Sequence, residues 1–231
     1  MGPGAMNQDQ SLDIVIDLMT SLTPFALSRI GDGEAQILEG KSVKCHKGSF
    51  EFDSKDTKSR ELLMSSMNNE DECFYYAIPC RCHWPKHNNS VRSVIKSKNL
   101  LLANLLVNGN WKRWTSFCLK HLTERTVFLV VNRKMDVSKL PFEVTKVWRV
   151  DDDALKNNCS THDAINKYVS ENNVEGAVFL IAAGPYSCVI VDKCFEKKNT
   201  FIDIGSSLDH YMGTHSRRYQ TSENHIYCDK I

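Results

Sequence analysis

Two short apolar segments limit the folds that this chain can adopt. Residues 126–131 (Thr-Val-Phe-Leu-Val-Val) and 177–182 (Ala-Val-Phe-Leu-Ile-Ala) lack the apolar–polar alternation of a half-exposed strand. Such runs are typical of strands buried on both faces, as in a parallel sheet covered by helices. Amphipathic segments alternate with these strands along the chain. The pattern therefore predicts an α/β fold with a mostly parallel sheet and helices on both faces.

The other expected elements follow from apolar periodicity and turn residues. We expect Ser54 to cap a helix over 57–67, and Ser160, with Asp163 in the capping-box position, to cap another that runs to Glu171. The expected strands cover residues 25–29, 73–78, 126–131, 144–150, 177–182 and 200–204, and the expected helices cover residues 12–22, 34–38, 57–67, 90–107, 161–171 and 186–198.

Composition narrows the partners and the location. The 231 residues carry a net charge of +1, so no global field favours nucleic acid as a partner. No stretch approaches the roughly 20 apolar residues that span a bilayer, so we expect no integral membrane segment. The N-terminus lacks the features of a secretory signal. Residues 1–6 (Met-Gly-Pro-Gly-Ala-Met) are interpreted as a cloning remnant, and we expect one domain over 7–231.

The nine cysteines are irregularly spaced and include no Cys-x-x-Cys pair. This pattern disfavours a disulfide framework and favours a reducing compartment, so we predict a cytoplasmic location. The run Cys80-Arg81-Cys82-His83 has donor types that bind zinc. Its spacing is not that of a standard zinc finger, and His87 as a fourth ligand is only a guess. Structural zinc is therefore the less favoured interpretation.

The loop Ser28-Arg29-Ile30-Gly31-Asp32-Gly33-Glu34 joins an expected strand to an expected helix. Its glycines permit close approach of a ligand. A dinucleotide-binding loop would occupy the same place, but Gln36 stands where that loop has its third glycine. The carboxylates of Asp32 and Glu34 would repel a diphosphate unless Mg²⁺ or Mn²⁺ lay between them. The loop indicates a metal–diphosphate site. The alternative is a solvated turn in which the helix dipole stabilises Glu34 at the helix start.

Two later loops also follow apolar strands, where ligands of parallel sheets bind. Gly184 lets the backbone pass close to a ligand, and Pro185 suits the first position of a helix whose N-terminus can hold phosphate. The alternative is tight packing of helix on strand. Asp203 lies within an apolar strand, where an acid is costly unless it is bonded or liganded. A turn of small residues, Gly205-Ser206-Ser207, follows it.

The C-terminal part of the chain supplies the candidates for acid–base chemistry. Asp209 or His210 is positioned in sequence to deprotonate an acceptor hydroxyl, although Asp209 also suits an ordinary helix start. Arg217 and Arg218 are candidates for neutralising diphosphate charge, and the alternative is a solvated surface loop. Two tryptophans are expected either in the core or as a platform for an acceptor, namely Trp111 and Trp114.

These motifs together resemble those of the GT-D type glycosyltransferases, first described as a domain of unknown function (DUF1792). The features that carry the resemblance are the Arg29-to-Glu34 loop with its D-x-E motif, Gly184-Pro185, and the strand end Ile202-Asp203-Ile204-Gly205. The resemblance extends over about residues 25–220. It implies a Rossmann-like fold and a metal placed through Asp32 and Glu34. Ser-Ser-Leu-Asp follows Gly205 where some members have a His-containing run, which leaves the general base open.

The resemblance implies a hexosyl- or pentosyltransferase. It would move a sugar from a nucleotide-diphosphate donor, with UDP favoured, to a glycan, a glycoprotein or another hydroxyl acceptor. Asp32 would then serve catalysis through the metal. The donor-binding candidates are Arg29, Gly31, Gly33, Gly184, Pro185, Asp203, Gly205, Ser206, Arg217 and Arg218. Two alternatives stay open: an NAD(P)-dependent oxidoreductase, which the missing glycine and the paired acids disfavour, and a noncatalytic nucleotide-sugar-binding module.

Overall fold

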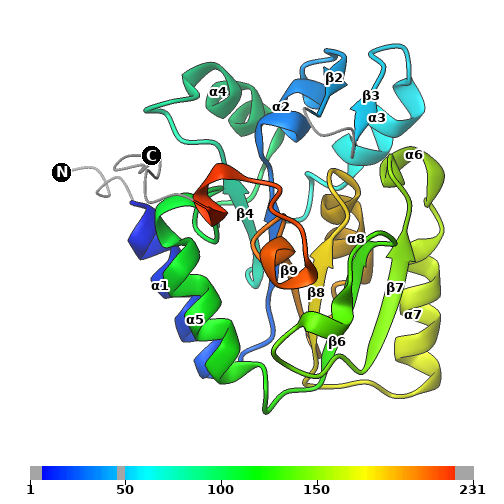
Figure 1. The fold of residues 1–231 in the computed structure, drawn as a ribbon. Helices are drawn as coiled ribbons and strands as arrows, with labels where there is room; N and C mark the ends of the chain where they lie inside the picture. The colour runs from blue at the N-terminus through cyan, green and yellow to red at the C-terminus, as the bar shows by residue number, and fades with distance from the viewer. Residues whose placement is uncertain (1–6, 46–49, 222–231) are drawn as a thin grey trace.

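A computed structural model describes residues 7–45 and 50–221, so the expected remnant over 1–6 lies outside the described residues. Seven strands form one central sheet in the order β5-β4-β1-β9-β8-β6-β7 (Figure 1). Every pairing between neighbours is parallel, which confirms the predicted sheet. The strands are β1 (Ala26–Arg29), β4 (Phe74–Ile78), β5 (Leu100–Leu102), β6 (Val127–Asn132), β7 (Lys146–Val150), β8 (Val178–Ala182) and β9 (Thr200–Asp203).

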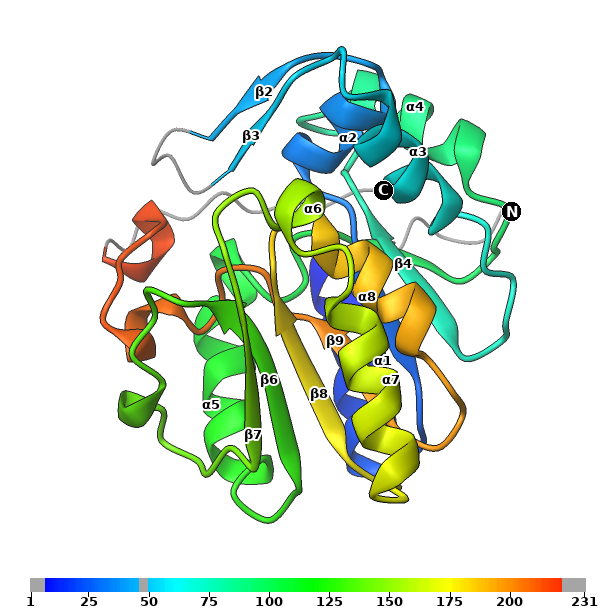
Figure 2. The same ribbon diagram turned by 90° about the vertical axis from the view of Figure 1, so that its right-hand side faces the viewer.

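Helices cover both faces of this sheet, as predicted (Figure 2). α1 (Gln8–Thr20) and α5 (Trp111–His121) pack on one face, and α7 (Thr161–Glu171) and α8 (Tyr186–Cys194) pack on the other. None of the helices in the described part of the chain is long and apolar enough to cross a membrane.

Side chains from the two faces of the sheet enter separate hydrophobic cores. On the α8 side, the ring of Phe179 stacks between those of Phe128 and Phe201, with centroids 4.7 and 4.4 Å away. Their neighbours in sequence, Leu180 and Ile202, belong to the core under α1 and α5. Since successive strand residues point to opposite faces, burial on both faces requires the unbroken apolar runs of β6 and β8.

The smaller elements gather beyond the carboxyl ends of the strands, where both views place α2, α4 and the β2–β3 hairpin (Figures 1 and 2). This hairpin was not expected from the sequence. Two short 3₁₀ helices, η3 (Asp209–Met212) and η4 (Arg218–Gln220), follow β9. The other elements here are α2 (Asp32–Leu38), β2 (Val43–Lys44), β3 (Glu51–Phe52), α3 (Thr57–Ser65), α4 (Pro85–Val94) and α6 (Ala154–Asn157).

The prediction of one helix over residues 90–107 is wrong beyond Val94. Helix α4 begins at Pro85, because proline suits the first turn, and it ends at Val94. The apolar run that follows supplies β5, which pairs with β4 at the edge of the sheet. The side-chain amide of Asn99 donates to the Glu72 carbonyl at 2.9 Å and ties the entry of β5 to the residues that precede β4.

Two expected capping interactions and one expected helix end also differ. Asp56, rather than Ser54, caps α3, since its carboxylate accepts a hydrogen bond from the Ser59 N–H at 3.1 Å. Ser160 occupies the N-cap position of α7, but its side chain makes no capping bond there. Helix α8 ends at Cys194 instead of residue 198, because the chain becomes extended at Phe195, whose ring packs against the core.

Candidate active site

A cavity of about 590 Å³ opens at the carboxyl edge of the sheet, within the size range of small-molecule sites. Parallel strands place the loops that follow them at this edge, which is where ligands of open α/β sheets bind. Of the residues that the sequence suggested, those that line the cavity are Arg29, Gly31, Asp32, Glu34, Gly184, Pro185, Asp203, Gly205, Ser206, Asp209, Arg217 and Arg218. Gly33 and His210 are not among the lining residues.

Arg29 stands at the end of β1 and is held from two sides. Its Nε donates a hydrogen bond to the Ala103 carbonyl at 3.0 Å, just beyond β5. Its guanidinium lies against Gly205, where an added Cβ would come 2.2 Å from Nη1. Gly205 also has a φ of +49°, which side-chain-bearing residues rarely adopt. The turn after β9 therefore needs glycine both for its backbone conformation and for the close approach of Arg29.

Asp203 ends β9 as a buried acid, only 5% exposed. Its Oδ1 accepts a hydrogen bond from the Gly205 N–H at 2.9 Å. Loss of hydration raises the pKa of Asp203 to about 6, although the positive charge of Arg29 acts in the opposite direction. The positive charge of Arg29 therefore offsets only part of the cost of burying Asp203.

Glu34 lies in the first turn of α2, and its Oε2 accepts a hydrogen bond from the Gly31 N–H at 2.9 Å. Part of its surface faces the cavity, but protein atoms surround the carboxyl group. Burial raises the pKa of Glu34 to about 7, and the negative charges of Asp203 and Asp32 raise it further. At this wall of the cavity, two neighbouring carboxylates thus add to the effect of burial on Glu34.

This acidic wall fits a hard divalent cation, which would relieve the repulsion between the carboxylates. Within residues 7–45 and 50–221, no three carboxylates have oxygens that all lie within 4.8 Å of one another. A closed cage is therefore not formed by these side chains. Mg²⁺ is commonly held by one or two carboxylates and completed by substrate phosphates and water. Asp32 and Glu34 fit that arrangement, and it remains a prediction.

Asp209 begins η3 and is 6% exposed, and it lines the cavity. Its Oδ2 accepts a hydrogen bond from the Ser216 hydroxyl at 2.5 Å, which orients the carboxylate. The neighbouring His210 turns its ring toward Trp111, at a centroid distance of 5.3 Å, and toward His215, at 6.0 Å. Burial, and then the nearby His215, lower the pKa of His210. The two catalytic candidates thus occupy different surroundings.

The two tryptophans of α5 have a core role that also supports the site. Both indole N–H groups reach the turn after β9: Trp111 Nε1 donates to the Ser207 carbonyl at 2.7 Å, and Trp114 Nε1 donates to the Ser207 hydroxyl at 3.1 Å. Trp114 is fully buried and Trp111 is 9% exposed. Together they fix the segment that leads from Gly205 to Asp209.

The basic loop is held against the same turn. Tyr219 in η4 shares a hydrogen bond of 2.8 Å between its hydroxyl and that of Ser206. The Gln220 amide donates to the Ser206 carbonyl at 2.7 Å. Arg217 and Arg218 are exposed, and both line the mouth of the cavity. The cavity therefore has cationic groups at its mouth and at Arg29, and acidic groups at its α2 wall.

The third predicted loop leads from β8 into α8. Gly184 has a φ of +58°, and Pro185 is the N-cap, one position before the predicted one. The Ser187 hydroxyl accepts a hydrogen bond from the Ala183 N–H at 2.9 Å. The N-terminal end of α8 is thus at the cavity, where backbone N–H groups and the helix dipole favour an anion.

Several lining residues were missed by sequence reasoning. Asn132 ends β6 and Asp151 directly follows β7, so the rule that ligands bind at strand ends was sufficient to find them. Trp84 and Asn104 come from loops after β4 and β5. Finding these two requires the order of strands in the sheet, because residue type alone does not mark them.

The chain is thus a Rossmann-like α/β protein with a parallel central sheet and a cavity at the strand ends. No protein-family model matches the chain, and no curated protein matches it. Solved structures do match.

One is described as showing that the highly conserved domain of unknown function 1792 has a distinct glycosyltransferase fold; its TM-score is 0.61 at 16% identity, over 89% of this chain and 79% of that one. A second, described as a new glycosyltransferase of this kind from Streptococcus sanguinis, has a TM-score of 0.61 at 16% identity, over 88% of this chain and 81% of that one. A selenomethionine-substituted structure of the same domain gives 0.59 at 15% identity, over 88% and 78%. At these identities the likeness concerns the fold, and it confirms the predicted fold class.

Gly205→Ala is expected to destabilise the protein by about 2–4 kcal/mol, through backbone strain and displacement of Arg29. Gly176→Ala is the matched control, since Gly176 has a φ of +69° but nothing within 4 Å of an added Cβ. The control should lose only about 1–2 kcal/mol. Urea unfolding of both variants measures the difference. Equal losses would contradict the close approach of Arg29 to Gly205.

Glu34→Gln is expected to change how stability depends on pH. Because the folded pKa of Glu34, about 7, exceeds the ordinary value of 4.5, its contribution to stability is present below pH 4.5 and is lost as pH rises through 7. Glutamine keeps an acceptor for the Gly31 N–H and does not ionise. In EDTA, the melting temperature of the variant should gain roughly 2–6 °C on the parent between pH 4.5 and 8.

The exposed Glu61→Gln in α3 serves as the control for this pH series. Its melting temperature should follow that of the parent across the same range. A Glu34→Gln difference that stays constant with pH would show that the Glu34 carboxyl group titrates normally in the folded protein.

Proposed function

We propose that this protein is a glycosyltransferase that takes a sugar from a nucleotide-diphosphate donor with the help of Mn²⁺ or Mg²⁺. One observation carries the proposal: Arg29, the half-buried Glu34 and the buried Asp203 all line the cavity at the carboxyl edge of the sheet, and the pKa values of both acids are raised. The likeness in fold to structures described as glycosyltransferases supports it. The favoured donor is a UDP-hexose or UDP-pentose, and the acceptor is a hydroxyl of a glycan or glycoprotein.

The diphosphate of the donor is placed between the N-terminal end of α8 and the cationic side chains. Backbone N–H groups near Gly184 and Pro185 suit phosphate oxygens. Arg29 supplies a fixed guanidinium, since Ala103 and Gly205 restrict it on two sides. Arg217 and Arg218 at the mouth add positive charge that favours approach of an anionic donor.

Asp32 and Glu34 hold the divalent ion in this proposal. When bound, the ion would stabilise the charge that develops on the leaving diphosphate. Glu34 must lose its proton to act as a ligand, and its pKa of about 7 makes metal affinity depend on pH near neutrality. Asp203 adds a further negative charge that acts on Glu34. It also orients the turn after β9 by accepting a hydrogen bond from the Gly205 N–H.

Asp209 is the proposed general base toward the acceptor hydroxyl if the transfer inverts the sugar. It lines the cavity, and the Ser216 hydroxyl fixes one of its oxygens. A carboxylate held in this way can accept the proton of a nucleophilic hydroxyl as the bond to the sugar forms. His210, which does not line the cavity, is the weaker candidate.

Thermal unfolding with a panel of UDP-, GDP- and TDP-sugars tests donor binding. A matching donor with Mn²⁺ at about 100 times its Kd should stabilise the protein by about 2.7 kcal/mol, or roughly 5–10 °C. Asp32→Asn combined with Glu34→Gln should remove the Mn²⁺-dependent part of the shift, and Glu61→Gln should keep it. No shift with any donor would refute donor binding.

The same panel separates the alternatives. Saturable NAD(P)H binding without metal would favour an oxidoreductase. Donor binding with neither hydrolysis nor transfer, over a range of acceptors, would favour a noncatalytic nucleotide-sugar-binding module.

Asp209→Asn is expected to lower the transfer rate by about 10²–10⁴-fold while the donor-induced thermal shift persists. Asparagine keeps the acceptor for the Ser216 hydroxyl but loses basicity. His210→Gln is the comparison variant and should lower the rate by less than about tenfold. Release of the nucleotide diphosphate in the presence of an acceptor gives the rate. The reverse order of effects would move the base to His210.

A further inference from the structure

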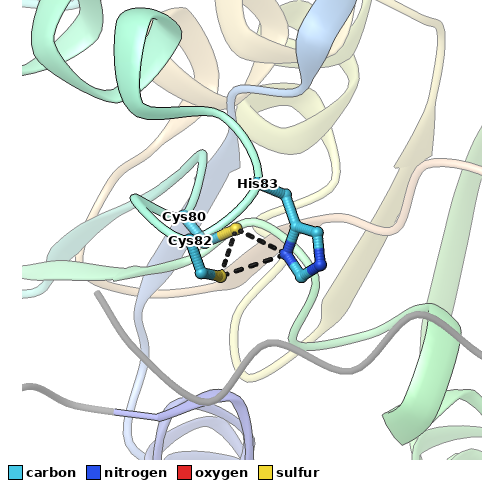
Figure 3. A group of neighbouring side chains, drawn as sticks. All are labelled: Cys80, Cys82 and His83. Atoms are coloured by element: carbon cyan, nitrogen blue, oxygen red, sulfur yellow. Dashed lines mark hydrogen bonds between the residues drawn. The ribbon is translucent and has the colours of Figure 1, made fainter.

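The loop between β4 and α4 brings two thiols and an imidazole together beside the cavity (Figure 3). The sulfurs of Cys80 and Cys82 are 3.0 Å apart, and His83 Nδ1 lies 3.1 Å from the Cys82 sulfur and 3.6 Å from that of Cys80. Within the described ranges, this is the one group of three His, Cys, Asp or Glu residues whose ligand atoms all lie within 4.8 Å.

The fold of the loop imposes this convergence. The Trp84 N–H donates to the Cys80 carbonyl at 3.1 Å, so the chain turns back on itself across the three residues. Fully buried Asn88, in α4, donates from its side-chain amide to the Pro79 carbonyl at 2.6 Å. Its Oδ1 accepts a hydrogen bond from Arg81 Nε at 3.1 Å. One buried amide therefore holds both the start and the middle of the loop.

His87 does not belong to this group. Its Nδ1 is 2.8 Å from Glu39 Oε1, and its ring stacks on that of Trp84 at a centroid distance of 5.5 Å. The sequence guess that made His87 a fourth ligand is therefore wrong. Three ligands come from the described residues, which leaves the fourth position of a tetrahedral ion for a ligand from outside that set.

We propose that Cys80, Cys82 and His83 bind Zn²⁺. Thiolate and imidazole are the donors that zinc takes most often, whereas Mg²⁺ and Mn²⁺ take oxygen. With bonds of about 2.3 Å to sulfur and about 2.0–2.1 Å to nitrogen, tetrahedral ligands lie about 3.8 Å apart for two sulfurs and about 3.5–3.6 Å apart for sulfur and nitrogen. Cys80 and His83 already have this spacing, at 3.6 Å.

Cys82 completes the site with a small outward movement. Its sulfur must move by less than about 1 Å away from the Cys80 sulfur and the His83 Nδ1 to reach tetrahedral spacing. Its side chain is exposed, so the rotation meets little resistance. Coordination turns both thiols into thiolates, and their two protons pass to solvent, so binding strengthens as pH rises.

Zinc bound at this loop would restrict the movement of one wall of the cavity. Cys80 is 3% exposed and lines the cavity together with Trp84, the residue that closes the turn. A zinc ion on Cys80, Cys82 and His83 would fix this turn and hence the position of the Trp84 indole. The proposal does not depend on sugar transfer, because its ligands are separate from Asp32 and Glu34.

Cobalt titration of the reduced, full-length protein tests the proposal. After chelator treatment and its removal, Co²⁺ should give a near-ultraviolet thiolate-to-metal band and visible bands of tetrahedral cobalt, saturating at one ion per chain. Zn²⁺ should abolish these bands because it binds such sites more tightly. Cys82→Ser and His83→Ala should each weaken the affinity by about tenfold or more. Both side chains are exposed, and melting curves without metal check that the variants fold.

Two controls separate this site from other thiols and from the acidic wall. Cys159→Ser, which replaces another exposed cysteine, should leave the cobalt spectrum unchanged. The double variant Asp32→Asn with Glu34→Gln should also leave the cobalt spectrum unchanged. Failure of the zinc proposal can therefore be distinguished from failure of the donor-dependent thermal shift in this variant. Absence of a thiolate band in the reduced protein, or an unchanged cobalt affinity in Cys82→Ser, would overturn the zinc site.

Discussion

Burial of the central strands on both faces determines where ionisable side chains can lie in this protein. β1 and β9 are neighbours whose pairing places Ala26 beside Phe201 and Leu27 beside Ile202. The next residue along the chain is Ser28 in β1 and Asp203 in β9. Arg29 and Ile204 follow them. Ionisable groups therefore occur where these two strands end, and segments far apart in the sequence bring an arginine and an acid to one point.

The charges that meet there do not cancel. Arg29 lowers the pKa of Asp203, yet the effect of burial is larger, and burial together with the charges of Asp203 and Asp32 raises the pKa of Glu34 to about 7. A buried acid without full compensation destabilises the fold near neutral pH. Strongly perturbed carboxyl groups in a cavity are typical of functional sites. A divalent ion would supply the positive charge that this acidic wall lacks, and a diphosphate would supply negative charge for the ion and for Arg29.

The sequence was sufficient for those parts of the fold that local pattern encodes. The apolar runs of β6 and β8 could be read directly, and Asp203 was conspicuous because an acid inside such a strand is costly. The run from Leu100 to Val107 was misread as helix, since a short apolar run fits both periods and only pairing with β4 decides between them. The close approach of Arg29 to Gly205 was equally hidden, because it depends on the register of β1 against β9.

The thiol cluster shows the same division between pattern and geometry, and it bears on metal selection. The sequence shows the donors of Cys80-Arg81-Cys82-His83, but their convergence depends on a turn closed by Trp84 and on Asn88 from the next helix. Mn²⁺ binds more weakly than Zn²⁺ to any given set of ligands, so an acidic site cannot select it by affinity alone. The two proposed sites would differ in donor type: thiolate and imidazole attract zinc, while carboxylates and phosphate oxygens suit Mg²⁺ or Mn²⁺. A zinc ion at the β4–α4 loop is therefore compatible with a different metal at Asp32 and Glu34, and each site can be perturbed without the other.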